Sequence, residues 1–381
     1  MHAGLYCLAR LAGGDDGPES SEHRSMIVDQ GAVASCVGAM QRFSGSLGVL
    51  LAGCVAISNL ARGRRDVGRD RRCDALVTGT GAARMCVSIL KDTSIGGGQG
   101  AGAARGRLVE ASLMALQGLC YDSGANHDAM VSGETRRDAF VDGVGAIQPV
   151  LGAMAAHLVD AAVQQRGLLV LMSVLRGGGG SLDRRIDAVL KVRLRDVTGV
   201  EPRLALDTGA NEAATAAAAH LQTASTEKGS PDGLDTASVL ARSSRGPRGT
   251  GPGGLAQDAG KGEAADCALL RLAAWAAHRF DSRPQVVSNA LGVMAFVCFG
   301  VTLSAGEQRR RLVFAAGGVG LAAKVARELA LKEPRLAERA VLLLSRVALD
   351  SEGRIDAVLA AGGAFRLVSI MAAHREVGLI Q

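Results

Sequence analysis

Apolar residues recur at the spacing of one helix face in six segments of the chain. Each segment opens with a small residue, and apolar residues follow one, four, seven and eight positions later. This spacing matches a period of 3.6 residues, which predicts an α-helix that is buried along one side. The small residue would let a neighbouring helix approach closely. The six segments begin at Gly4, Gly53, Ser112, Gly167, Ala290 and Ala340.

A second pattern, an arginine followed by a glycine, precedes most of these helices. The arginine stands nine residues before a glycine that opens a further apolar run. Glycine permits a sharp turn, so the pattern predicts a short first helix, a break and a second helix. The pairs are Arg72 with Gly81, Arg136 with Gly145, Arg309 with Gly318 and Arg354 with Gly363; Gly31 follows Arg24 at a shorter distance.

The distance from the break to the small residue of the next helix is nearly constant. It is 22 residues from Gly31 to Gly53, and the same from Gly145 to Gly167 and from Gly318 to Ala340. The interval from Gly81 to Ser112 is 31 residues, and the glycine-rich segment 96–104 accounts for the excess. A repeated unit of this size is the signature of a solenoid in which each unit packs on its neighbours.

The middle of the chain departs from this regularity. The hexapeptide 185–190 is identical to 354–359, which indicates another first helix near residue 184. We expect its break near Leu194 and its third helix at 213–221, which would make a degenerate repeat. Segment 225–262 is rich in Pro and Gly and predicts a disordered insertion. Order resumes at 263, in a unit that we expect to hold two helices. The predicted domains are 1–226, 227–262 and 263–381.

The repeats resemble the armadillo family. The clearest matches are residues 354–368, residues 145–151 and the segment Ala56-Ile57-Ser58-Asn59-Leu60-Ala61. The resemblance implies an all-α fold, a right-handed α-solenoid of three-helix repeats, here with long loops and one disordered insertion. It also implies that the third helices line a concave groove that binds extended peptides or other proteins.

Importin-α-like members of that family carry a Trp and an Asn on the third helix, which grip a peptide backbone. Only Asn59 matches here, and most other equivalent positions are apolar. The resemblance therefore implies a partner-binding face of different chemistry, and it does not favour nuclear import of basic cargo. The residues expected on this face are Tyr6, Arg10, Val55, Asn59, Met114, Leu342 and Arg346.

Composition narrows the remaining choices. Aromatic residues make up 3% of the 381 residues, which argues against a β-sandwich or barrel. The net charge of +6 is mild, and we interpret the basic run 62–72 as a solvated connector rather than a nucleic-acid patch. The uncharged stretch 286–303 is interpreted as a buried core helix rather than a membrane span. The eight cysteines lack zinc-site spacing and fit a reducing compartment, so the expected location is cytoplasmic or nuclear.

No catalytic motif, cofactor motif or metal-ligand set emerges from the sequence. The favoured hypothesis is a non-catalytic scaffold that binds a protein or peptide, with no cofactor and no metal. The alternative is a fragment of a larger multidomain protein or enzyme whose catalytic module lies outside this chain. Because neither end carries a polar capping repeat, we also expect self-association through exposed apolar ends.

Overall fold

We analysed a computed structural model of the chain. It describes residues 2–14, 18–63, 67–92, 102–120, 136–176, 179–198, 267–300, 303–329 and 332–363. Within these ranges the regular structure is helical, apart from one isolated β-bridge. The expected all-α solenoid of three-helix units is confirmed for these residues.

The helices fall into three classes by their position in the repeat. The first helices are α2 (Pro18–Asp29), α5 (Val67–Asp74) continuing into the π-helix η1 (Ala75–Gly79), residues 136–138 continuing into η2 (Ala139–Gly143), α11 (Gly179–Leu190), α17 (Leu303–Ala315) and α20 (Glu352–Ala360). The second helices are α3 (Ala32–Arg42), α6 (Ala82–Lys91), α9 (Ile147–Ala156), α15 (Ala268–Arg279) and α18 (Gly318–Glu328). The third helices are α1 (His2–Leu11), α4 (Leu47–Ala61), α7 (Gly102–Cys120), α10 (Ala161–Val174), α16 (Pro284–Val297) and α19 (Pro334–Ala348).

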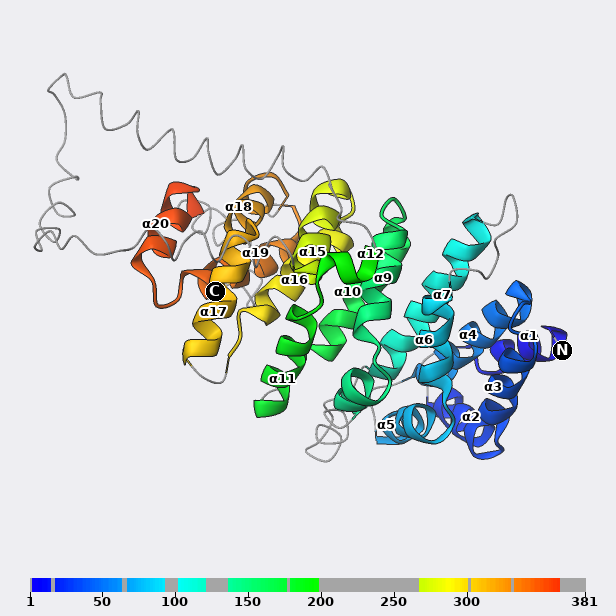
Figure 1. Cartoon of the computed structure of the whole chain (residues 1–381). Helices are drawn as coiled ribbons and strands as arrows, with labels where there is room; N and C mark the ends of the chain where they lie inside the picture. The colour runs from blue at the N-terminus through cyan, green and yellow to red at the C-terminus, as the bar shows by residue number, and fades with distance from the viewer. Residues whose placement is uncertain are drawn as a thin grey trace, which may run out of the picture.

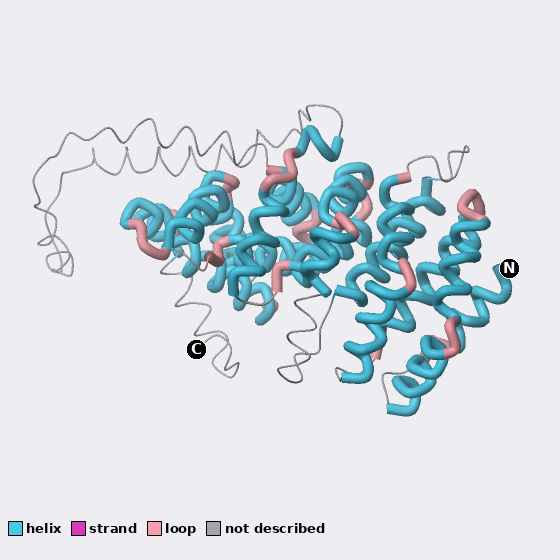
Figure 2. Tube along the Cα trace, turned by 60° about the horizontal axis from the view of Figure 1, so that its bottom comes forward, coloured by secondary structure: helices cyan, strands magenta, loops and turns pink. Residues whose placement is uncertain are grey.

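The third helices form one continuous row. Each contacts the next in the order α1, α4, α7, α10, α16, α19. Figure 1 shows the units progressing from the blue N-terminal end to the orange and red end, with α2, α5 and α11 along the lower edge. The tube in Figure 2 shows the same stack of helices joined by short loops.

The middle of the chain holds one intact unit, where the sequence suggested two incomplete ones. First helix α11 packs on second helix α15, and third helix α16 packs directly on α10 of the preceding unit. The short helix α12 (Leu194–Thr198) contacts α9 and α15. Helix α11 ends at Leu190 and α12 begins at Leu194, which agrees with the expected break near Leu194. The expectation of a two-helix unit is wrong, because α11 packs on α15 as a first helix. The expected third helix at 213–221 and the expected disorder of 225–262 lie outside the described residues.

The residues that follow α11 contact the start of α15 directly. The Ala268 amide donates to the Val192 carbonyl at 3.0 Å, and Arg193 forms an antiparallel bridge with Cys267. These contacts hold the end of the first helix of this unit beside the start of its second helix. A fixed-interval search of the sequence misses this unit, because the insertion separates its first helix from its second.

Glycine marks the breaks between first and second helices. Gly31, Gly81 and Gly145 have φ of 74°, 72° and 61°, as the sequence pattern predicts. In the two C-terminal breaks the left-handed residue is one position earlier, at Gly317 and Gly362. Gly318 and Gly363 serve close packing there, because a Cβ atom would lie 2.9 Å and 2.6 Å from the Val313 and Val358 carbonyl oxygens.

Two of the small residues in the third helices, Gly53 and Gly167, allow the close approach that the sequence predicts, whereas a Cβ atom on Gly4 would have no neighbour within 4 Å. A Cβ atom on Gly53 would lie 2.4 Å from Sδ of Met40 in α3, and one on Gly167 would lie 2.5 Å from Cγ of Met154 in α9. Both methionines are fully buried. Helices α4 and α10 therefore each hold a methionine from their own second helix in the space that the glycine leaves.

Helix α16 covers most of the uncharged stretch 286–303, and its apolar residues are buried in the solenoid core. Among the described residues, no single helix has the length and hydropathy needed to cross a membrane. Two bent helix pairs, Gly68–Gly79 with Ala82–Lys91 and Arg136–Gly143 with Ile147–Ala156, satisfy those criteria together.

Candidate partner-binding surface and an arginine ladder

The residues predicted to bind a partner lie on the row of third helices. On α1, Tyr6 is 57% exposed and Arg10 is also exposed. Val55 of α4, Met114 of α7 and Leu342 of α19 are half-buried at equivalent positions. The row thus offers a partly apolar surface that runs across successive units.

Two members of the predicted set are hydrogen-bonded within the solenoid. Nδ2 of Asn59 donates to the Ala9 carbonyl of α1 at 2.8 Å, and Nη1 of Arg346 donates to the Ala295 carbonyl of α16 at 2.7 Å. Both donors occupy the same position in their third helices, and both acceptors the same position in the preceding one. These side chains therefore tie neighbouring third helices together.

Arg346 has a second contact that fixes its orientation. Its guanidinium lies 3.7 Å from the ring centroid of Phe299, which is 42% exposed. This stacking is a cation–π contact. Burial lowers the pKa of the Arg346 guanidinium, and the neighbouring Arg339 acts in the same direction. The two side chains form a fixed, half-exposed platform at the end of α16.

The structure also places buried arginines in the described first helices, and in each of the six one of them occupies an equivalent position. We call these six arginines the arginine ladder, and none of them is more than 5% exposed. Five of the six are the arginines that precede the inter-helix glycines, and the sixth belongs to the repeated hexapeptide. The ladder comprises Arg24, Arg72, Arg136, Arg185, Arg309 and Arg354.

Five ladder arginines donate to carbonyl groups at the end of the preceding third helix. Their acceptors lie within the last two residues of that helix or just beyond it. Helix C-termini leave carbonyl groups without intrahelical donors and carry partial negative charge, so a cation is favourable there. The contacts are Arg24 to Ala12, Arg72 to Leu60 and Arg62, Arg185 to Arg176, Arg309 to Phe299, and Arg354 to Val347 and Leu349.

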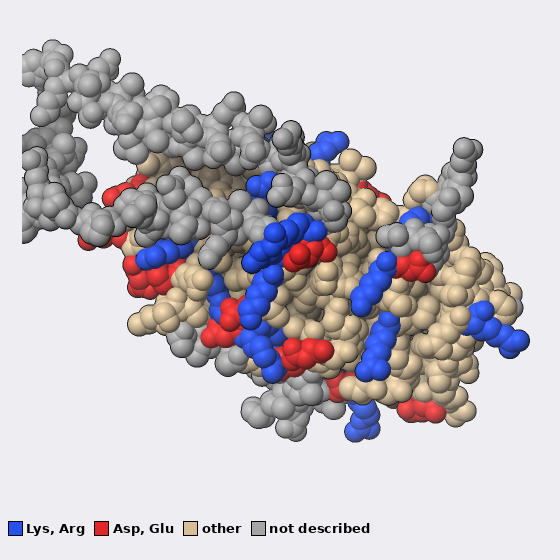
Figure 3. Space-filling model, in the orientation of Figure 1, with Lys and Arg blue, Asp and Glu red and all other residues tan. Residues whose placement is uncertain are grey.

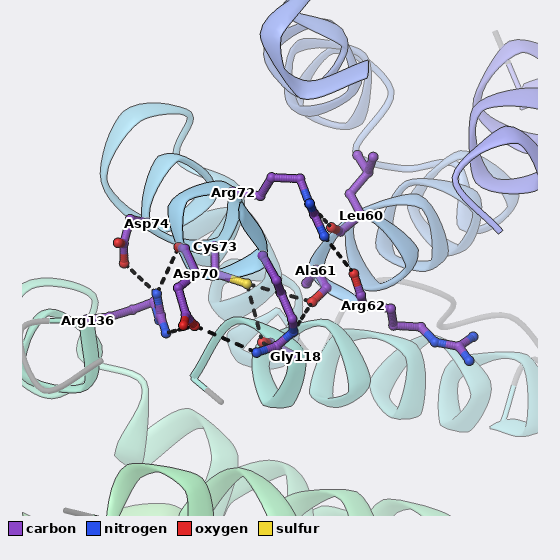
Figure 4. Close-up of polar contacts among 10 residues, drawn as sticks. Leu60, Ala61, Arg62, Asp70, Arg72, Cys73, Asp74, Gly118 and Arg136 are labelled. Atoms are coloured by element: carbon purple, nitrogen blue, oxygen red, sulfur yellow. Dashed lines mark hydrogen bonds and ion pairs between the residues drawn. The ribbon is translucent and has the colours of Figure 1, made fainter. Parts of the chain in front are cut away.

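Each ladder arginine from Arg72 onward also reaches back to the first helix of the preceding unit. Figure 4 shows one such step, in which Arg136 lies between Asp70 and Asp74 of α5. Those aspartates stand two residues before and two after Arg72. Acceptors at the same offsets recur as Asp138 for Arg185, Asp183 and Asp187 for Arg309, and Glu307 for Arg354.

The interpretation of the basic run 62–72 as a solvated connector is wrong for Arg69 and Arg72, whereas Arg62 and Arg71 are exposed as expected. Arg69 is 5% exposed and Arg72 is 3% exposed. Arg69 donates to the Ala61 carbonyl at 3.0 Å and to the Gly118 carbonyl at 3.0 Å, bridging two third helices. The regular spacing of arginine before glycine could have indicated this burial, because a solvated side chain is not constrained to a fixed distance from a turn.

The described residues contain no group of three or more His, Cys, Asp or Glu side chains placed to hold a metal ion. Burial raises the pKa of Cys36 to about 12, and it does the same for Cys298. These thiols are therefore protonated at neutral pH and behave as small core residues rather than nucleophiles. Glu307 has its pKa lowered to about 2, chiefly by the hydrogen bond from Arg354.

Charges of both signs are interspersed on the face drawn in Figure 3. Basic and acidic side chains lie beside each other in a band near the middle of that view. Nucleic-acid binders characteristically gather basic residues on one face or along one helix. This face has no such single-signed patch among the described residues.

One comparison with a solved structure supports the fold. No family model and no curated protein matches the chain. The crystal structure of an engineered protein is similar with a TM-score of 0.53 and 15% identity, covering 91% of this chain and 89% of that one. A designed armadillo repeat protein in complex with the peptide (KR)4 is similar with a TM-score of 0.49 and 13% identity, covering 91% and 92%.

Proposed function

We propose that this chain is a non-catalytic scaffold that binds a polypeptide partner along its row of third helices. The observation that carries the proposal is the uninterrupted contact of these helices from α1 to α19. A surface built from equivalent positions of successive units suits a partner that extends over several of them. The half-exposed side chains of Val55, Met114 and Leu342 would supply apolar contacts along it.

The hydrogen bonds of Asn59 and Arg346 shape what this surface can recognise. Their donors are engaged by the neighbouring helices, so they are poorly placed to satisfy the backbone of an extended peptide. An amphipathic helix satisfies its own backbone and needs mainly apolar contacts from its partner. We therefore favour a helical or side-chain-anchored partner over an extended one bound through a ladder of amides.

Selection from a displayed library of random peptides, with the intact chain as bait, tests this proposal. Selected peptides would then be titrated against the double variants Tyr6→Ser/Arg10→Glu and Val55→Thr/Met114→Gln. A control, Arg71→Glu, makes the same charge change as Arg10→Glu at an exposed position of first helix α5.

We expect the peptides to lose at least tenfold in affinity for one or both double variants and to bind the control normally. Circular dichroism of each variant would show that the helices are retained. Equal affinity for all variants, or loss confined to Arg71→Glu, would contradict the choice of face.

A further inference from the structure

The identical hexapeptides 185–190 and 354–359 lie in equivalent helices with different surroundings. In α11, Ile186 is fully buried, and Arg309 of α17 pairs with Asp183 and Asp187. In α20, the equivalent Ile355 is 43% exposed and Leu359 is 52% exposed. The same sequence is therefore packed against neighbours in one unit and open in the other.

The open side chains of α20 form one continuous helix face. Glu352, Ile355, Asp356 and Leu359 follow the spacing i, i+3, i+4 and i+7, which places them together. All four are exposed. We call this set the α20 face. It combines two carboxylates one turn apart with two large apolar side chains.

The two carboxylates occupy the ladder's acceptor positions. Glu352 and Asp356 stand two residues before and two after Arg354, as Asp183 and Asp187 do around Arg185. In α11 the two aspartates pair with one arginine of the following first helix, and Asp70 and Asp74 of α5 do the same with Arg136. The α20 face thus carries the acceptor half of a contact that is completed at two earlier steps.

We propose that the α20 face is a docking surface for an amphipathic helix of a partner protein that presents an arginine to Glu352 and Asp356. The partner's arginine would form two charge-assisted hydrogen bonds, which are stronger than neutral ones. Apolar residues three and four positions after it would cover Ile355 and Leu359. Helix α17 carries residues of these types at this spacing, with Arg309 followed by Leu312 and Val313.

Helix α17 therefore supplies a probe with the required chemistry. A fluorescent peptide with the sequence of residues 303–315 would be titrated against the intact chain and followed by anisotropy. A second peptide carrying Arg309→Gln tests the arginine. The protein variant is Glu352→Gln/Asp356→Asn, and the control is Glu19→Gln/Asp29→Asn, which removes two exposed carboxylates from α2.

We expect the unmodified peptide to bind the chain and the α2 control alike, and about tenfold more weakly to the α20 variant. The Arg309→Gln peptide keeps Arg310 and Arg311 but lacks the arginine meant for Glu352 and Asp356, so it should bind the unmodified chain and the α20 variant equally weakly. Ile355→Ser should also weaken binding, which separates docking from general attraction between charges. Helix content by circular dichroism should be unchanged in every variant, because the substituted side chains are exposed.

Equal binding to the α20 variant and the α2 control would overturn the proposal. Light scattering provides a second test. A dimer mass for the unmodified chain and a monomer mass for the α20 variant would also overturn the proposal, because a second copy of the chain would then occupy the face. Neither result depends on the row of third helices. Failure here and failure of the proposed function are thus distinguishable.

Discussion

The arginine ladder links α2 to α5 through Arg72 and α11 to α17 through Arg309. These two arginines occupy the same position in the repeat but have different surroundings. Arg72 donates to the hydroxyl groups of Ser21 and Ser25 at 3.1 and 2.9 Å and to the Ser21 carbonyl at 3.0 Å. Arg309 instead pairs with two aspartates. Both arginines reach the carbonyl end of the third helix before them.

The contact that Arg72 and Arg309 share indicates the structural role of the ladder arginine. The carbonyl end of the third helix is present in both, while the acceptor on the preceding first helix changes from hydroxyl to carboxylate. The serines also stand one residue earlier around Arg24 than the aspartates do around Arg185. We infer that satisfying the helix terminus fixes the arginine, and that the preceding first helix contributes whichever acceptor lies within reach.

The largest expected effect is that of Arg309→Leu. This change removes the cation that pairs with Asp183, whose side chain is 20% exposed, and the guanidinium that donates to the Phe299 carbonyl. Removing one member of a largely buried ion pair costs about 3 kcal/mol or more of unfolding free energy. Urea unfolding followed by circular dichroism measures it. The control Arg311→Leu, in the same helix but 63% exposed, should cost less than about 0.5 kcal/mol.

Arg72→Leu should lower the free energy of unfolding by less, about 1 to 2 kcal/mol. The hydroxyl groups of Ser21 and Ser25 are neutral, so their loss of the arginine leaves no buried charge uncompensated. The same urea titration applies, with Arg71→Leu as its exposed neighbour control. Equal losses for Arg72→Leu and Arg309→Leu would show that the carboxylates add nothing to the ladder. The difference between the two steps would then be one of sequence only.

The two steps also show which parts of the structure the sequence could predict. Helix periodicity and the arginine-to-glycine spacing located the α2–α3–α4 unit, because its three helices are close together in the chain. The same spacing failed for α11, α15 and α16, because a long segment separates α11 from α15. Contacts such as that of Val192 with Ala268 depend on where the chain returns, and periodicity carries no information about that.

The candidate surface was predictable only in outline. Equivalent helix positions placed Tyr6, Met114 and Leu342 on the third helices, and the structure agrees with that placement. The engagement of Asn59 and Arg346 with neighbouring helices was not predictable, because it depends on the distance between helices. The buried arginines were missed for a related reason: arginine is rarely buried, and only its partners reveal why it is here.

Acid should selectively weaken the ladder contacts in which a carboxylate accepts from an arginine. The contact of Glu307 with Arg354 offers a direct test. Its pKa in the folded chain is about 2, held low first by the hydrogen bond from Arg354. A lowered folded-state pKa contributes stability above the ordinary pKa of a glutamate, and that contribution is lost as the pH falls toward 2. Wild type should therefore exceed Glu307→Gln in melting temperature at pH 6, and the gap should close between about pH 4.5 and pH 2.

The matched control for this titration is Glu22→Gln, which removes an exposed carboxylate from α2. Its melting temperature should follow that of wild type throughout the same pH range. A gap between wild type and Glu307→Gln that persists unchanged at pH 2 would contradict the role assigned to the Glu307 carboxylate. The Arg72 step, served by hydroxyl groups, has no corresponding acid-sensitive acceptor in Ser21 and Ser25.

The smallest expected effect converts one kind of step into the other. Ser25→Asp places a carboxylate where a hydroxyl now accepts from Nη1 of Arg72 at 2.9 Å. Because Ser25 is half-buried, the gain should be below about 1 kcal/mol of unfolding free energy. A double-mutant cycle with Arg72→Leu isolates the pair, and the stabilisation should vanish when Arg72 is absent. If Ser25→Asp stabilised the chain equally in both backgrounds, the carboxylate would be acting elsewhere, and the first step would not be equivalent to the others.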